Sequence, residues 1–410
     1  MNSTAGLSCA QSMVSTSSKN YNNVSIIAVL FILFSPAVSF DVFYILNFIF
    51  FTPFLLSNRN KFNFKTMSFL LSVFFLFFTW AIFKSIIFGN VYDIKEFVKI
   101  TLFVFVFFSV SDKNLNAFHN ALLFYVIADF CVSLFQFFHL SFPFSELISS
   151  IYNSSSHSEF SSSLNSVRAL GLSPGPGQHG ILAIFSFSFF LMRYSFSDYR
   201  YTSLLGVILS VGLIVLSQSK TAILILVIMF AIYSFLVMAT KGWSSVFFVL
   251  SIICVASFSV FSYWDMLTAT FYDLKRLAEF GLKVSSMGAR IEIWLAQIGA
   301  VIDSNVVLFI FGAGRSYLEF LGVYNNSFDN DYVYVFVCYG VVGLVFFISI
   351  ASIFIWKLFH FSTLSESNRV ITFVIVTGLF MGTSLDFYSD VKMIALLAYL
   401  FRVHYNAIKC

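Results

Sequence analysis

The chain has 410 residues, of which 59% are hydrophobic and only 10% are charged. Ordinary soluble domains carry about 25% charged residues. The low charge, together with apolar runs near membrane-spanning length, therefore predicts an all-α polytopic membrane protein. The net charge of +4 provides no basic stripe for phosphate backbones, so we expect no nucleic acid partner. The five cysteines show no CxxC spacing, which predicts neither a disulfide framework nor a zinc site.

Residues 1–23 are polar and rich in serine, without the charged-then-apolar order of a cleavable signal peptide. We expect a disordered cytoplasmic tail there, followed by one integral membrane domain over residues 24–410. Apolar runs of about 15 to 25 residues predict about twelve transmembrane helices. They fall near residues 24–40, 42–57, 67–88, 97–110, 117–140, 179–193, 201–217, 220–239, 243–261, 331–356, 369–386 and 390–405.

Two long segments, 141–178 and 262–330, separate groups of predicted spans. If the N-terminus is cytoplasmic, the short inner loops hold more basic residues, such as Arg59 and Lys65, than the short outer segments and span ends. The positive-inside rule then places both long loops on the periplasmic side of the membrane. Apolar residues at helical spacing predict a helix from about residue 264 to 302.

Two basic residues lie next to turns in or near the first long loop. Arg168 precedes the breaker Pro174–Gly177, which places its side chain at the mouth of the next span. A guanidinium can bind phosphate oxygens through two parallel hydrogen bonds, although an arginine at this depth can also extend to lipid headgroups. Lys220 follows a very short connection and provides a further, weaker cation at the outer surface.

The second long loop contains two further arginines. Arg290 and Trp294 are four residues apart and share a helix face. Trp294 is either an aromatic wall for sugar or an interfacial tryptophan. Arg315 follows the glycine turn Gly312–Gly314, which is too short for a Walker loop and lacks its lysine.

Acidic residues stand at two places. Asp329 and Asp331 precede a long apolar run, where they either cap a helix or supply a carboxylate base facing a bound sugar. The Asp-x-Asp pattern also occurs in metal-binding glycosyltransferases, but these are soluble proteins built around a sheet, and we predict no metal and no cofactor. Asp129 lies inside a predicted span, where ionisable residues usually face a cavity or the bundle interior.

The order of these motifs resembles the bacterial O-antigen polymerase and ligase superfamily, and Wzy-type polymerases in particular. The segments that carry the resemblance are 168–171, 217–222, 290–294, 312–314, 329–332 and 339–344. Two departures exist. Lys220 stands where arginine is commoner, and the His-Asn pair typical of ligases is absent near Asn325-Asn326, which favours a polymerase.

The resemblance implies a GT-C-like glycosyltransferase fold in the bacterial cell inner membrane. It implies that undecaprenyl-diphosphate-linked oligosaccharide units are joined at the periplasmic face, with membrane lipids and a chain-length regulator (co-polymerase) as partners. The lipid diphosphate would leave with its charge stabilised by cations, and a carboxylate would accept the proton of the attacking hydroxyl. The candidates are Arg168, Arg290, Arg315 and Lys220 for the diphosphate, Trp294 for sugar, and Asp329 or Asp331 for the base.

Two other functions fit parts of this pattern. The first is an O-antigen ligase of the same superfamily. The second is a flippase or transporter for the same lipid-linked units, in which Asp129 and the arginines would line a path. The sequence shows no inverted hydropathy halves, which argues against a transporter.

Overall fold

The computed structural model describes residues 25–58, 64–110, 115–140, 144–153, 168–241, 285–323, 329–385, 387–388 and 390–408. Within these ranges every regular element is a helix and there is no strand. The prediction of an all-α protein is therefore confirmed for this part of the chain. The predicted tail, the predicted span at 243–261 and residues 141–143 and 154–167 of the first long loop lie outside the described residues.

The first half of the chain forms helices close to the predicted apolar runs. A short helix Ser25–Phe34 comes first. It is followed by α2 (Phe40–Asn58), α3 (Phe64–Phe88), α4 (Tyr92–Ser109) and α5 (Leu115–Phe137). The first long loop carries the short helix α6 (Ser145–Tyr152).

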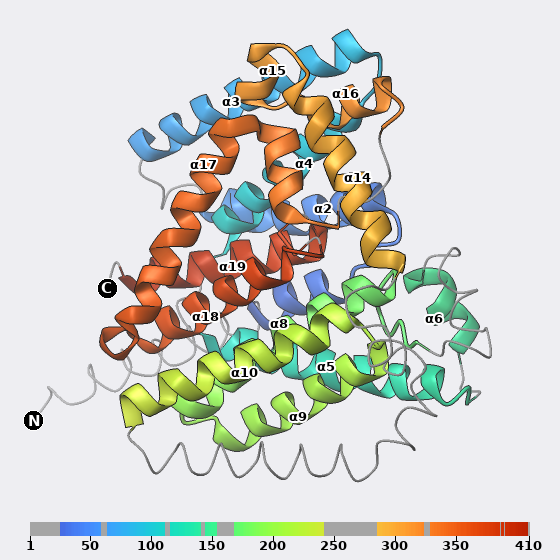
Figure 1. Ribbon diagram of the computed structural model, residues 1–410. Helices are drawn as coiled ribbons and strands as arrows, with labels where there is room; N and C mark the ends of the chain where they lie inside the picture. The colour runs from blue at the N-terminus through green and yellow to red at the C-terminus, as the bar shows by residue number, and fades with distance from the viewer. Residues whose placement is uncertain are drawn as a thin grey trace, which may run out of the picture.

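The core of the bundle is built around α8 (Pro176–Phe196), which is buried along nearly its whole length. It contacts α5, α9 (Arg200–Ser217), α10 (Lys220–Lys241) and α18 (Glu366–Met381), as Figure 1 shows. Helix α9 approaches closely because Gly206 faces the ring of Phe190, and any Cβ there would collide with that ring. Small residues commonly allow this close packing between membrane helices.

Among the described residues, six helices are long and apolar enough to cross a membrane: α2, α5, α8, α9, α10 and α17 (Asp331–Phe359). The prediction of about twelve spans is thus not confirmed, although α3, α4, α18 and α19 (Val391–Ile408) also form at predicted positions. Helix α4 carries four charged residues and α18 has only 16 residues, whereas α3 contributes the shorter apolar stretch Phe75–Phe88. Six apolar helices of spanning length in the described part of the chain indicate a polytopic membrane protein.

Helix α17 corrects one predicted span. Gly340 has a φ of 65° and a ψ of −162°, which no helical residue adopts, so the chain bends sharply there. Figure 1 shows the two halves of α17 meeting at an acute bend. The predicted single span at 331–356 is therefore two helices, because a residue without a Cβ can leave the helical conformation in the middle of an apolar run.

The described part of the second long loop forms α14 (Ser285–Ile302), α15 (Val306–Phe311) and α16 (Gly314–Phe320). These helices and the first half of α17 bury a second apolar cluster against α3, which includes Val301, Leu308, Leu318 and Val337. The predicted helix at 264–302 is confirmed over 285–302, and its earlier part lies outside the described residues. The GT-C-like fold stays a prediction.

Candidate functional site

An ion pair joins two of the predicted site residues. The Nε atom of Arg290 on α14 lies 3.3 Å from Oδ2 of Asp329, which is two residues before the first residue of α17. Both side chains are about one third exposed, at 33% and 29%. A cation predicted to bind diphosphate and a carboxylate predicted to accept a proton therefore lie side by side at a solvent-accessible position.

The contacts of Arg290 fix one side of its guanidinium group. Nε faces Asp329, and Nη1 donates a hydrogen bond to the carbonyl oxygen of Ser384 at 3.1 Å. The second Nη1 hydrogen and both Nη2 hydrogens have no partner among the residues that the structure describes. The Nη edge therefore retains the paired donors that bind two oxygens of a phosphate group.

The connection between α18 and α19 ties this ion pair to neighbouring helices. Ser384 donates its hydroxyl hydrogen to Oγ1 of Thr221, in the first turn of α10, at 3.0 Å. The side-chain amide of Asn330 donates to the carbonyl of Thr383 at 2.9 Å. The start of α10, which carries the predicted cation Lys220, thus lies beside the Arg290–Asp329 pair.

Arg168 is linked to the same end of the bundle through its neighbour. The N–H of Ala169 donates to the carbonyl of Leu216, at the end of α9, at 3.0 Å. The turn after Leu216 leads directly into α10. In addition, Gly180 in α8 lies so close to Ser219 that a Cβ would collide with it. The backbone of Arg168 is therefore fixed next to the α9–α10 turn through the hydrogen bond of the adjacent residue, Ala169.

Asp331 has a different environment from Asp329. Its side chain is fully buried, and its Oδ2 accepts a hydrogen bond from the N–H of Tyr388 at 2.8 Å. Its own N–H donates to the carbonyl of Gly382 at 2.7 Å. These contacts join the start of α17 to the α18–α19 connection, so of the two predicted bases only Asp329 is exposed to solvent.

Arg315 lies in a buried group of charges away from Arg290. Its Nε is 2.8 Å from Oε1 of Glu96, and Lys99 is 3.0 Å from the other carboxylate oxygen. Lys84 pairs with Asp93 at 3.4 Å in the same region, beneath the bend of α17. The diphosphate role of Arg315 stays a prediction, and this pairing makes it the weaker candidate.

Trp294 lies half-buried against the second apolar cluster, where it anchors α14 to α15, α16 and the first half of α17. This packing does not test the predicted role of Trp294 in sugar binding, which stays a prediction. No group of three or more His, Cys, Asp or Glu side chains that could hold a metal ion occurs in the described ranges.

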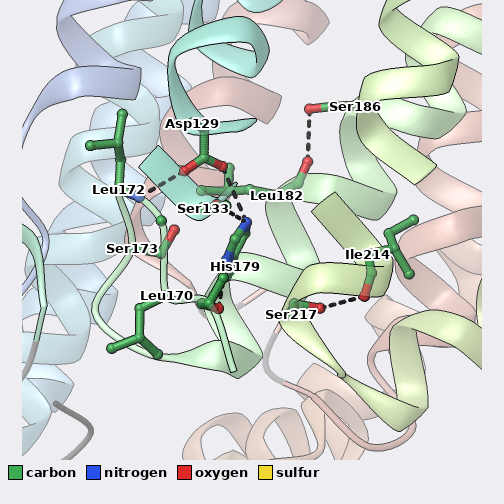
Figure 2. Close-up of polar contacts among 12 residues, drawn as sticks. Asp129, Ser133, Leu170, Leu172, Ser173, His179, Leu182, Ser186, Ile214 and Ser217 are labelled. Carbon is green, nitrogen blue, oxygen red and sulfur yellow. Dashed lines mark hydrogen bonds and ion pairs between the residues drawn. The ribbon is translucent and has the colours of Figure 1, made fainter. Parts of the chain in front are cut away.

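Asp129 faces the interior of the bundle, as its depth in a span predicts. Figure 2 shows its carboxylate between Leu172 and His179. Oδ1 accepts the N–H of Leu172 at 2.7 Å, and Oδ2 lies 3.4 Å from Nε2 of His179. The structure thereby identifies the partners of Asp129, which the sequence could not name.

Two residues at the site, Thr221 and Ser384, were not among the predicted ones. Ser384 lies in a segment without a charged or glycine-rich motif, and its main contact to Arg290 uses a backbone carbonyl. A contact made by a backbone carbonyl cannot be predicted from side-chain motifs in the sequence. Thr221 belongs to the 217–222 segment that carries the family resemblance, so its neighbourhood, though not its role, was signalled.

Comparisons with known proteins give one match. A family model described as O-antigen ligase matches residues 205–348, which include α10, α14 and the Arg290–Asp329 pair. A search of curated proteins found no match. The family match supports the O-antigen polymerase and ligase superfamily and a role in surface polysaccharide biosynthesis. It does not distinguish a polymerase from a ligase.

Proposed function

We propose that this chain is a polymerase for O-antigen or a related surface polysaccharide. In this proposal it joins undecaprenyl-diphosphate-linked oligosaccharide units at the periplasmic face of the inner membrane. The match over residues 205–348 supports the pathway. The observation that supports the reaction is the Arg290 guanidinium, which Asp329 and Ser384 hold from one side while its Nη edge retains its donors.

The reaction breaks the bond between C1 of the donor sugar and the oxygen of its lipid diphosphate. The hydroxyl oxygen of the acceptor sugar forms the new bond to C1, and the diphosphate leaves with the electron pair. Fixed cations stabilise negative charge that develops on a leaving group, and they need no reorganisation at the moment of reaction. We assign this task to Arg290, with Arg168 beside the α9–α10 turn and Lys220 at the start of α10.

The proton of the acceptor hydroxyl must leave as the new bond forms. Asp329 is one third exposed and lies next to the cation, so it can contact the acceptor while Arg290 contacts the diphosphate. A general base has to be within hydrogen-bond reach of the proton that it accepts. We assign Asp329 to this role in preference to Asp331, whose Oδ2 receives a backbone N–H inside the protein.

The partners follow from this reaction. Both substrates carry a lipid, so the site has to lie near the membrane surface. Helices α8, α9 and α10 are long and apolar enough to span a membrane, so their ends would lie near its surface. A polymerase also needs control of product length, and we propose a chain-length regulator as its protein partner. No metal or organic cofactor enters the proposed reaction.

The lipopolysaccharide ladder of a deletion strain tests the proposal. Loss of a polymerase leaves single repeat units on lipid A–core and removes the longer bands. Loss of a ligase or a flippase removes the single-unit band as well, so this result would favour one of these two alternatives over a polymerase. An unchanged ladder would remove the protein from this pathway. Complementation with the wild-type chain and with Arg290→Ala then connects the phenotype to the site.

A further inference from the structure

The segment Ala169–Ser173, which follows Arg168, is held by buried side chains from several helices. Asp129 accepts the N–H of Leu172, and His179 contacts the carbonyl of Ala169 through Nδ1 at 3.0 Å. Figure 2 shows Asp129 and His179 meeting beside this segment. Both side chains are fully buried, so water cannot replace these contacts.

The contact to Ala169 determines which hydrogens this pair needs. A carbonyl oxygen only accepts, so Nδ1 of His179 carries its hydrogen. Nε2 then faces Oδ2 of Asp129 at 3.4 Å and Oγ of Ser133 at 3.5 Å. Two lone pairs would repel each other across the gap between Nε2 and Oδ2, so either Nε2 of His179 or Oδ2 of Asp129 carries a hydrogen.

Other side chains hold further backbone groups of the segment. Oε1 of Gln136 accepts the N–H groups of Leu170 and Gly171 at 3.0 and 2.7 Å. Asn153 donates to the carbonyls of Gly171 and Ser173. Lys392 on α19 donates to the carbonyl of Leu172 at 3.2 Å.

Gly171 permits this arrangement. Its φ is +54°, in the left-handed region, and a Cβ would collide with Oδ1 of Asp129. Side chains of α5, α8 and α19, together with Asn153, therefore determine the path of a five-residue backbone segment. The only polar side chain of the segment itself is the buried hydroxyl of Ser173, and the charged Arg168 directly precedes the segment. This amount of buried polar contact is more than an ordinary surface turn requires.

We propose that Asp129, acting with His179, is a positioning residue for Arg168. The pair fixes the backbone of Ala169–Ser173 and thereby holds the guanidinium of Arg168 at the α9–α10 turn, where the proposed function places the lipid diphosphate. This inference rests on that proposed function for the chemical role of Arg168. The positioning itself is measurable without substrate.

A nitroxide label at residue 168 measures the positioning directly. The label is attached to Arg168→Cys in a full-length chain whose five native cysteines are replaced by serine. Asp129→Asn keeps an acceptor for Leu172 and supplies an amide hydrogen to Nε2 of His179, so the label should stay as immobile as in the parent. Asp129→Leu has a similar volume but neither contact, so the electron paramagnetic resonance spectrum should show a mobile label.

Two further variants keep this test decisive. Gln136→Ala removes the acceptor for two N–H groups at a partly buried position, and it should also mobilise the label if Asp129→Leu does not fold. A label at Asp198→Cys, an exposed position between α8 and α9, should not respond to either change. An immobile label at 168 in folded Asp129→Leu or Gln136→Ala would overturn the proposal.

Activity on purified lipid-linked repeat units separates positioning from a general structural role. Misplacing a binding group by about 1 Å can reduce a rate on the order of 100-fold, so Asp129→Leu should approach Arg168→Ala, and Asp129→Asn should stay within about twofold of wild type. In the Arg168→Ala background, Asp129→Leu should lower turnover no further. A further loss, or an inactive Asp129→Asn with an immobile label, would refute positioning. Full activity of Arg168→Ala would instead refute its proposed diphosphate role.

Discussion

Replacement of Arg290 gives the most direct test of the proposed chemistry. Arg290→Ala removes the whole fork, and the loss of one preorganised donor to a developing anion reduces a rate about 100-fold to 1000-fold. Arg290→Lys keeps the charge but offers a single ammonium, which Asp329 attracts away from the diphosphate because it already lies 3.3 Å from the Arg290 Nε atom. We expect a loss of about 10-fold to 100-fold for this variant, or about 1.4 to 2.7 kcal/mol in the barrier.

The structure also predicts what should not change. Asp329 is 29% exposed, so water can solvate its carboxylate when Arg290 is removed, and the unfolding temperature should stay close to that of the wild type. Arg200→Ala is the matched control, because Arg200 is exposed at the opposite end of α9 from the site. The assay measures polymer formed by purified protein from synthetic lipid-linked repeat units. Full activity of folded Arg290→Ala would refute the diphosphate role.

Three further predictions follow from the geometry. Arg315→Ala leaves the buried Glu96 with Lys99 as its remaining close cation, which should lower stability by about 3 kcal/mol in thermal unfolding; an unchanged midpoint would contradict a structural role for Arg315. Gly340→Ala should abolish folded protein in size-exclusion chromatography, because the φ of residue 340 is positive and a Cβ there would collide with the backbone of α15. In the control Gly322→Ala, residue 322 has a similar φ but open space around it, so the free energy of unfolding should fall by only about 1 to 2 kcal/mol. Activity should survive a chelator, and its abolition would indicate a metal at the carboxylates.

The positions of most helices in the described residues could be predicted because an apolar run of spanning length has few alternatives to a helix in a membrane. The bend in α17 could not. Tyr339-Gly340-Val341 reads as an ordinary part of a membrane helix, in which glycine is common. The local sequence does not show that the backbone of α15 occupies the space where a Cβ at residue 340 would lie.

Charge pairing was the least predictable feature. Arg315 was assigned to the diphosphate because a single sequence cannot show that Glu96, more than two hundred positions earlier, lies 2.8 Å away. Lys84, at the end of α3, and Glu96 and Lys99, three residues apart on α4, form a pattern that could have indicated a buried group of charges. Arg290 and Asp329 were both nominated, but their contact depends on how α14 meets the start of α17.

The arrangement of helix ends gives an independent reason to expect an anion at this site. The N-terminal ends of α8, α10 and α17 converge on the α18–α19 connection, through the approach of Gly180 to Ser219 and the contacts of Thr221 and Asp331. The N-terminal end of a helix carries a partial positive charge and attracts anions. Cations are disfavoured there, yet the chain places Lys220 in the first turn of α10 and Arg290 beside it. Asp329 pairs with Arg290, and Asp331 stands at the start of α17. Helix stability alone still does not favour a cation at Lys220, whereas a bound diphosphate would be stabilised by Lys220, Arg290 and the helix ends together.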